Sequence, residues 1–298
     1  MRDAPLGKTD RVVEAIAREP WLITQGGLEL VMSVAERQLS NPEVAASIRA
    51  ARAEALEAAA PPAQDVALLE VFGVLTPRAS FFSEVSGLAS VAKLQKQFAA
   101  ALNDPKVKGI VLCIDSPGGQ VAGIHEFARQ VYAARGTKPV VAYVSSLAAS
   151  AAYWIACAAD EVVADRTAQL GSIGCVMVYV DRSKEQEAAG IVEREFVSSK
   201  SPKKRLSPAT KEGRAEVQAR VDELAEIFIG EVAAFRGVDT ATVEQDFGQG
   251  GTLMAEKAVA VGMADRLGSL SGVIKELSSR PPNGEQTIDL TPITFVTK

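Results

Sequence analysis

The chain has 298 residues, 47% hydrophobic and 23% charged, which suits one large or two small globular domains with a substantial core. A net charge of −5 and an aromatic content of only 5% argue against a nucleic-acid-binding surface. The three cysteines lie in apolar runs without CxxC spacing, and there is one histidine, so we expect no metal and no cofactor. No window of 18 apolar residues occurs, which predicts no membrane span.

The first 62 residues are predicted to form a helical arm and linker outside the catalytic layer. A run rich in Ala, Arg and Glu begins at Asn41-Pro42 and ends at Pro61-Pro62. Such an arm would either pack on a neighbouring molecule or remain a solvated lead-in.

From Val66 onward, strand and helix patterns alternate, which is typical of an α/β fold. No GxGxxG follows a strand, so a dinucleotide site is not indicated. The expected strands are residues 67–75, 109–114, 139–144, 161–164, 176–180 and 192–197. The expected helices are residues 91–102, 124–134, 148–159, 208–235, 240–247, 255–261 and 272–277, followed by a flexible tail at 279–298.

A serine lies at the junction of an apolar strand and an apolar helix. This residue, Ser150, would have its hydroxyl exposed near a helix N-terminus, where a developing anion is favoured. About thirty residues earlier, another apolar strand ends at Gly118-Gly119, whose N–H groups can point at an oxyanion. Together they predict acyl transfer with Ser150 as the nucleophile.

Three segments in this order carry a family resemblance: Ile114-Asp-Ser-Pro-Gly-Gly119, Leu147-Ala-Ala-Ser-Ala-Ala-Tyr-Trp154 and Gly171-Ser-Ile-Gly174. Over roughly residues 67 to 275 the chain resembles the signal peptide peptidase A family of serine proteases, most of all its phage head maturation (prohead) branch. The resemblance implies a Clp protease/crotonase-like spiral of ββα units and a Ser–Lys dyad in a peptidase domain at 63–278. It also implies a substrate cleft at Gly171, Ser172, Ile173 and Gly174, where Ser172 would either orient the base or serve as a turn residue.

The basic segment after residue 197 offers three candidate lysines for the dyad. Ungapped alignment from the downstream helix selects Lys200, whereas a Pro-x-Lys-Arg pattern in some phage relatives selects Lys204, which we favour; Lys203 remains a third candidate. Such a lysine must be neutral, which requires desolvation or nearby positive charge. The alternative base is His125, which we expect to be a surface or capping residue instead.

The resulting hypothesis is a serine endopeptidase that cleaves scaffold and capsid proteins within the phage prohead, in the host cytoplasm. The alternatives are a housekeeping or signal-peptide-degrading peptidase of the bacterial cytoplasm and a non-proteolytic assembly protein that keeps the fold. The helices at 41–60 and 208–235 carry more apolar surface than one α/β layer needs, which predicts a homo-oligomer.

Overall fold

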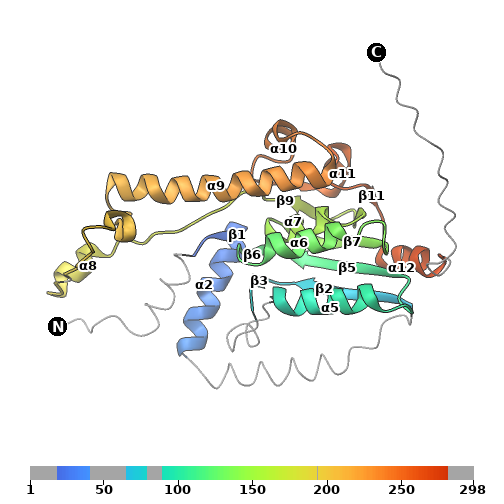
Figure 1. The fold of residues 1–298 in the computed structure, drawn as a ribbon, viewed down its shortest axis with the longest axis horizontal. Coiled ribbons are helices and arrows are strands. Elements are labelled where there is room, and N and C mark those ends of the chain that lie inside the picture. Colours follow the sequence, from blue (N-terminus) through green and yellow to red (C-terminus); the bar gives the residue numbers. More distant parts are fainter. Residues whose placement is uncertain (1–18, 41–64, 79–88, 193, 281–298) are drawn as a thin grey trace, which may run out of the picture.

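The computed structural model describes residues 19–40, 65–78, 89–192 and 194–280 (Figure 1). Its centre is a seven-stranded sheet in the order β10-β9-β7-β5-β2, with β8 and β11 continuing beside β7. All pairs are parallel except β10 with β9. The strands are β2 (Val66–Phe72), β5 (Gly109–Ser116), β7 (Val140–Ala149), β8 (Glu161–Ala164), β9 (Gln169–Gly171), β10 (Thr252–Met254) and β11 (Arg266–Leu267).

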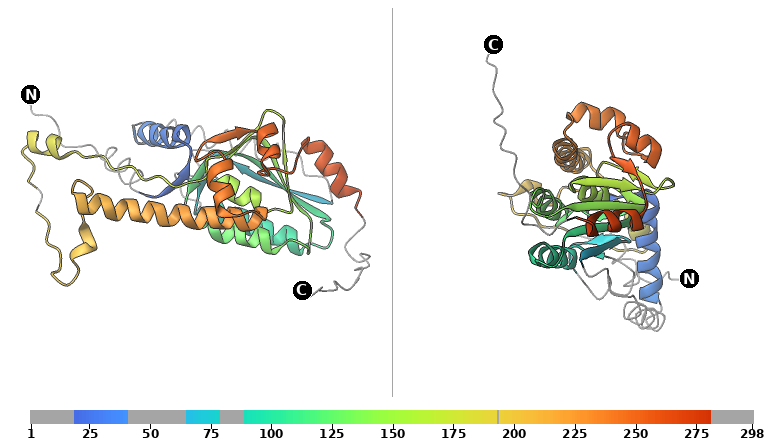
Figure 2. Two further views of the ribbon diagram at one scale, coloured as in Figure 1. Left: turned by 90° about the horizontal axis from the view of Figure 1, so that it is seen from above. Right: turned by 90° about the vertical axis from the view of Figure 1, so that its right-hand side faces the viewer.

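The central strand β5 is apolar on both sides because helices cover both faces of the sheet (Figures 1 and 2). Its residues alternate between two clusters: Ile110, Leu112 and Ile114 join the main core, while Val111 and Cys113 join a smaller one. Helices α5 (Val91–Asn103), α6 (Ile124–Ala133) and α7 (Ala151–Cys157) contribute to the main core, and α12 (Leu270–Ser278) to the other. The predicted α/β class is confirmed.

A second, four-stranded sheet lies at one edge of the body, in the order β1-β6-β3-β4. It consists of β1 (Trp21–Ile23), β6 (Gly118–Gln120), β3 (Leu75–Thr76) and β4 (Ala89–Ser90). Within residues 19–40 the structure differs from the predicted helical arm, because β1 belongs to this sheet and is followed by the helix α2 (Gln25–Ser40). The predicted 41–60 helix lies outside the described residues, as does most of the predicted tail.

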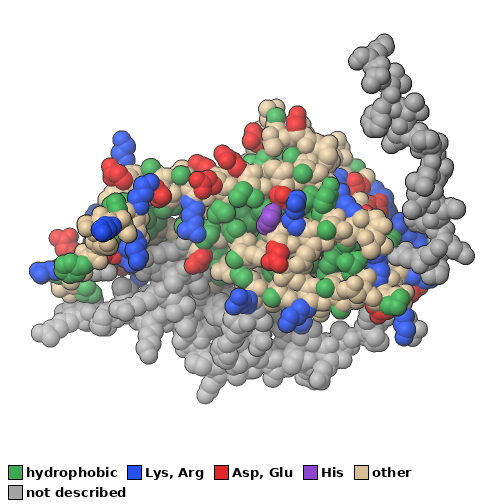
Figure 3. Space-filling view, viewed as in Figure 1, with side chains coloured by type: hydrophobic (Ala, Val, Ile, Leu, Met, Phe, Trp, Pro, Cys, Tyr) green, Lys and Arg blue, Asp and Glu red, His purple; other side chains and the backbone are tan. Residues whose placement is uncertain are grey.

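An arm formed by residues 177–210 and the first half of α9 (Lys211–Arg236) projects from the body (Figures 1 and 2). It contains α8 (Ser183–Ala188) and a 3₁₀ turn, η1 (Pro202–Arg205). The strands predicted at 176–180 and 192–197 are wrong for the residues that the structure describes there, because these have no strand assignment and no described strand runs along them; Val176 forms a single bridge with Trp21. Figure 3 shows charged side chains of both signs along this arm with apolar ones between them.

The remaining helices follow the sequence prediction closely. The long helix predicted at 208–235 is α9, with Thr210 as its N-cap and Gly237 ending it in the left-handed conformation. Two short helices, α10 (Thr240–Asp246) and α11 (Ala255–Ala260), return the chain to the sheet.

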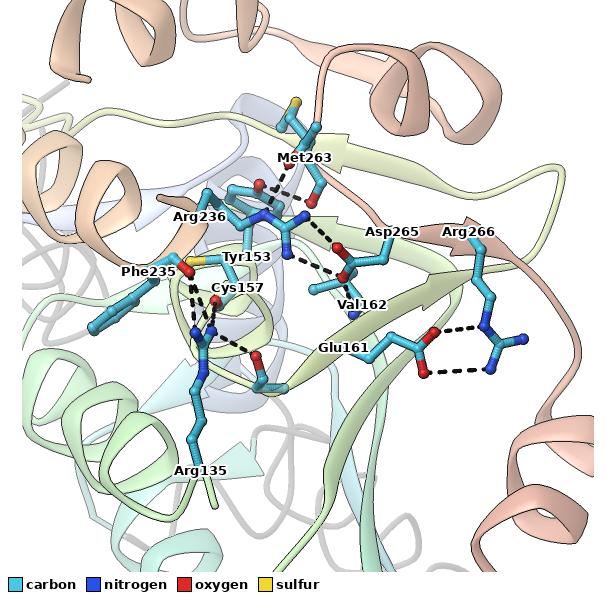
Figure 4. A network of polar contacts seen from close by, with 12 residues as sticks. Arg135, Tyr153, Cys157, Glu161, Val162, Phe235, Arg236, Met263, Asp265 and Arg266 are labelled. Atoms are coloured by element: carbon cyan, nitrogen blue, oxygen red, sulfur yellow. Dashed lines mark hydrogen bonds and ion pairs between the residues drawn. The ribbon is translucent and has the colours of Figure 1, made fainter. Parts of the chain in front are cut away.

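Two arginines join the end of α9 to the body (Figure 4). Arg135 donates hydrogen bonds to carbonyls at the C-terminal ends of α7 and α9, including those of Ala158 and Phe235. Arg236, whose side chain is 9% exposed, forms a bidentate ion pair with Asp265, which also accepts from the Val162 N–H at 2.6 Å. These bonds fix the helix that carries the arm against β8.

Replacing Arg236 with alanine should lower the free energy of unfolding by about 2 kcal/mol, because Asp265 would remain half-buried without its partner. Urea unfolding followed by circular dichroism measures this loss. The exposed ion pair Arg166–Glu256 supplies the control, since Arg166→Ala should change stability by no more than about 0.5 kcal/mol. Equal effects of the two substitutions would contradict the prediction.

The same pair makes stability depend on pH. Burial on its own would raise the pKa of Asp265, but hydrogen bonds from Arg236 and the Val162 N–H outweigh it and hold the pKa below its usual value. A carboxyl group with a lowered folded-state pKa stabilises the protein above its unfolded pKa of about 4, and this contribution is lost as the pH falls through the folded value. Asp265→Asn should therefore flatten the pH dependence of stability below about pH 4.

Candidate active site

Ser150 occupies the sharp turn between β7 and α7. Its backbone has φ 54° and ψ −119°, a conformation that side-chain-bearing residues rarely adopt. The turn is held by two hydrogen bonds, from the Ser150 N–H to the Gly171 carbonyl (2.7 Å) and from the Trp154 N–H to the Ser150 carbonyl (3.0 Å). Such strain at a strand-to-helix junction is typical of a nucleophile presented by the backbone.

The Ser150 hydroxyl is buried and unpaired. The residue is 1% exposed, and its Oγ has no hydrogen-bond partner among the described residues. Leaving a buried hydroxyl unpaired costs about 1–3 kcal/mol, so such groups are uncommon and call for an explanation. A catalytic serine whose base comes from elsewhere would account for it.

The Gly118-Gly119 strand β6 lies beside α7. Gly118 has φ +104°, which favours glycine, and its N–H points at Ser116 Oγ at 3.2 Å. Ser116 in turn donates to the Gly73 carbonyl at 2.6 Å and so joins this turn to the residue that follows β2. This hydrogen bond from the Gly118 N–H to Ser116 Oγ is long and therefore weak, so an oxyanion could replace Ser116 as the acceptor.

The predicted cleft segment also lies next to Ser150. Gly171 pairs with Ala149 at the end of β7, and the following Ser172 has φ 55° with its N–H bonded to the Gly251 carbonyl. Ile173 is buried in the main core, which anchors the segment. The structure therefore brings together Ser150, the Gly-Gly strand and residues 171–174.

The three candidate lysines are not brought to Ser150 within one chain. They lie in η1 or just before it, and so precede the N-terminus of α9. The Ser150 turn contacts α9 much further along, because Trp154, one turn after Ser150, stacks on Phe228 with ring centroids 4.5 Å apart. Phe228 lies 17 residues after Lys211, a rise of about 25 Å along the helix. Lys203 pairs with Glu216 at 3.2 Å.

His125 is placed as a surface residue. Its side chain is 55% exposed, its Nε2 lies 3.8 Å from Glu231, and its ring packs edge-on against Trp154. No hydrogen bond joins His125 to Ser150 among the described residues. Two other serines on β7, Ser145 and Ser146, are exposed and precede the turn.

In the part of the chain that the structure describes, no group of three His, Cys, Asp or Glu residues is arranged to hold a metal ion. No helix there is both long and apolar enough to cross a membrane.

Comparison with known proteins agrees with this arrangement. Residues 133–280, which include Ser150, residues 171–174 and the lysine segment, match the family model described as peptidase family S49. The chain belongs to peptidase family S49.

Several S49 relatives come from phages. The chain is 29% identical over 217 residues to the head-tail preconnector protein GP5 of Enterobacteria phage P21, covering 72% of this chain and 43% of that protein. It is 30% identical over 205 residues to the capsid assembly protease C of Escherichia phage lambda, covering 68% and 46%. Protease 4 of Salmonella typhi is 32% identical over 183 residues, covering 60% and 29%. The S49 chain thus spans less than half the length of these relatives.

Solved structures that align with this chain include a ClpP1 mutant from Listeria monocytogenes, with a TM-score of 0.44 and 13% identity, covering 69% of this chain and 94% of that one. Another is a mutant of the 1510-N membrane-bound stomatin-specific protease, with a TM-score of 0.46 and 14% identity, covering 72% and 86%.

Proposed function

We propose that this S49 chain is a serine endopeptidase in which Ser150 is the nucleophile and a lysine of the basic segment is the base. The observation that carries the proposal is the strained, buried and unpaired Ser150 beside the Gly-Gly strand. Its hydroxyl has no base within the described part of the chain, so a base must arrive from outside this arrangement for the serine to react.

In the proposed reaction, Ser150 Oγ attacks the scissile carbonyl and its proton passes to the neutral lysine. The lysine then returns the proton to the leaving amine, and water completes the second half of the reaction. The N–H groups of Gly118 and Gly119 are proposed to stabilise the oxyanion, where one donor contributes about 3 kcal/mol to lowering the barrier.

The arm supports a dyad formed between two copies of the chain. Its lysines lie on a segment that leaves the body, and its apolar side chains, such as Val192 and Phe196, are 78% and 92% exposed. A neighbouring copy would cover these side chains and could receive a lysine beside its own Ser150. We favour Lys204 and keep Lys200 as the alternative; Lys203, the third candidate, is already paired with Glu216.

The proposed substrates are scaffold and capsid proteins of an assembling phage head, and the proposed location is the prohead within the host cytoplasm. The similarity to the capsid assembly protease of phage lambda supports this choice. Incubation of the chain with the capsid and scaffold proteins of its own phage, followed by mass spectrometry of the fragments, tests it. Cleavage of signal peptides with no cleavage of these proteins would favour the housekeeping alternative, and no cleavage of either would favour the assembly role.

His125→Ala should leave the cleavage rate within about twofold of the parent, because the histidine is solvated and points to Glu231. Initial rates on one protein substrate measure this. A rate that falls by orders of magnitude in this variant, with all three lysine variants active, would overturn the Ser–Lys proposal.

A further inference from the structure

The short strand β1 lies between two segments of the proposed active site (Figures 1 and 2). On one side it pairs antiparallel with β6, placing Leu22 opposite Gly119 and Ile23 opposite Gly118. On the other side Trp21 forms a two-way bridge with Val176, in which each N–H donates to the other's carbonyl at 2.9 Å. Val176 lies two residues after the cleft segment 171–174, so β1 links the end of that segment to the Gly-Gly strand.

The backbone of β1 also covers the proposed oxyanion turn. The Thr24 N–H donates to the Pro117 carbonyl at 2.9 Å, and the Leu22 carbonyl occupies the space that a Cβ on Gly118 would need. A glycine at 118 thus allows another extended backbone to approach closely. Ser150, beside this turn, is 1% exposed. A protein substrate bound by strand addition needs an open strand position with backbone partners on its edges.

We propose that β1 occupies the position where a substrate strand binds and that it can be displaced from there, so that cleavage requires β1 to leave. The proposal rests on the proposed peptidase function. It also defines the substrate class: an extended peptide with three consecutive large apolar side chains, because Trp21, Leu22 and Ile23 are at most 5% exposed there. Leu22 projects into the main core, whereas its two neighbours join a small separate cluster.

The local structure favours displacement of β1 over permanent attachment. The strand has three residues, and among the described residues the cluster of Trp21 and Ile23 adds the buried Val31 and Val74 and the partly buried Leu28. Short elements with few buried apolar contacts open at a lower free energy than core strands such as β5. An incoming apolar peptide would replace the same backbone bonds and refill the Leu22 position.

The first test is peptide binding in a Ser150→Ala background, which prevents turnover. The probe is a fluorescent peptide with the chain's own residues 17–26, and its anisotropy reports binding to the full chain. The double substitution Trp21→Ala/Ile23→Ala should tighten binding at least about tenfold, because an occupied site weakens apparent affinity by the fraction of molecules that are open. Val131→Ala, which removes a core side chain of α6, is the matched control and should bind like the parent.

Equal affinities of the parent and the folded double variant would overturn the proposal. If circular dichroism shows that the double variant is unfolded, hydrogen exchange of the Ser150→Ala chain decides instead. Peptic fragments covering residues 19–24 should exchange at least about tenfold faster than those covering 109–116. Excess unlabelled peptide should accelerate exchange at 19–24 and slow it at 173–178.

Exchange of residues 19–24 at the rate of β5, unchanged by the peptide, would show β1 to be a permanent strand and would overturn the proposal. Neither measurement requires cleavage. If the binding and exchange results contradict the proposal for β1, the role of Ser150 is still decided by its own substitution. If the wild-type chain is inactive, the binding and exchange results can still be interpreted.

Discussion

Replacing Ser150 with alanine is expected to lower the rate of substrate cleavage by at least about 10³-fold, since loss of the nucleophile of a serine protease lowers kcat by about 10⁶-fold. The remaining machinery cannot form an acyl-enzyme without the hydroxyl. Rates measured on a protein substrate by fragment quantification would show the loss. Ser146→Ala is the matched control, because Ser146 lies on the same strand, is exposed and should be dispensable.

The same substitution should not destabilise the protein. The Ser150 hydroxyl is buried and makes no hydrogen bond among the described residues, so its removal relieves an unpaired polar group. We expect a free energy of unfolding equal to the parent's or higher by about 1 kcal/mol, in line with the trade-off between stability and activity at functional sites. An alanine variant that is folded and cleaves at the parent rate would refute Ser150 as the nucleophile.

The sequence is most informative where an element is long and its pattern is regular. Strand β5 was predictable from its uninterrupted apolar run, and α5 from apolar residues at helical spacing. Ser150 was predictable because the change from strand pattern to helix pattern places a serine at the turn. These features depend on near neighbours in the sequence, so no knowledge of distant contacts is needed to find them.

The errors occur where structure depends on distant partners. Strand β1 has three residues and gains its bonds from Gly118–Gln120 and Val176, about 100 and 155 residues away. Its signal, the short apolar run Trp-Leu-Ile between Pro20 and Thr24, is too brief to separate strand from helix. The apolar character of residues 176–180 predicts a buried strand, yet among the described residues no partner strand runs beside them.

The sequence also left the position of the proposed base open, and the structure places the candidate lysines in η1 or just before it, away from the Ser150 turn. The helix predicted at 208–235 is present, but its apolar positions are buried only towards the C-terminal end, at Phe228 and Val232. Ile227 is 51% exposed, and Val217 and Val221 are only partly covered. An apolar stripe that continues past the body, with a basic loop at its far end, is the arrangement expected of a subunit interface.

If the dyad forms between copies, two inactive variants should restore each other. Ser150→Ala subunits retain the lysine and Lys204→Ala subunits retain the serine, so an interface between them holds one intact site. When equal amounts of the two variants are unfolded and refolded together, random assembly should give about a quarter of the parent activity. At each site the serine is intact in about half of the cases, and independently the neighbour's lysine is intact in about half. Each variant refolded alone should be inactive.

Parallel mixtures with Lys200→Ala and Lys203→Ala identify the base. The base is the lysine that meets two requirements: its replacement abolishes activity, and Ser150→Ala subunits restore the activity of that variant. The other two lysine variants should stay active alone, since an exposed charge contributes little. We expect that lysine to be Lys204. Mixtures that remain inactive while native mass spectrometry shows mixed oligomers would place the serine and its base in one chain, and the arm would then have to fold back onto its own body.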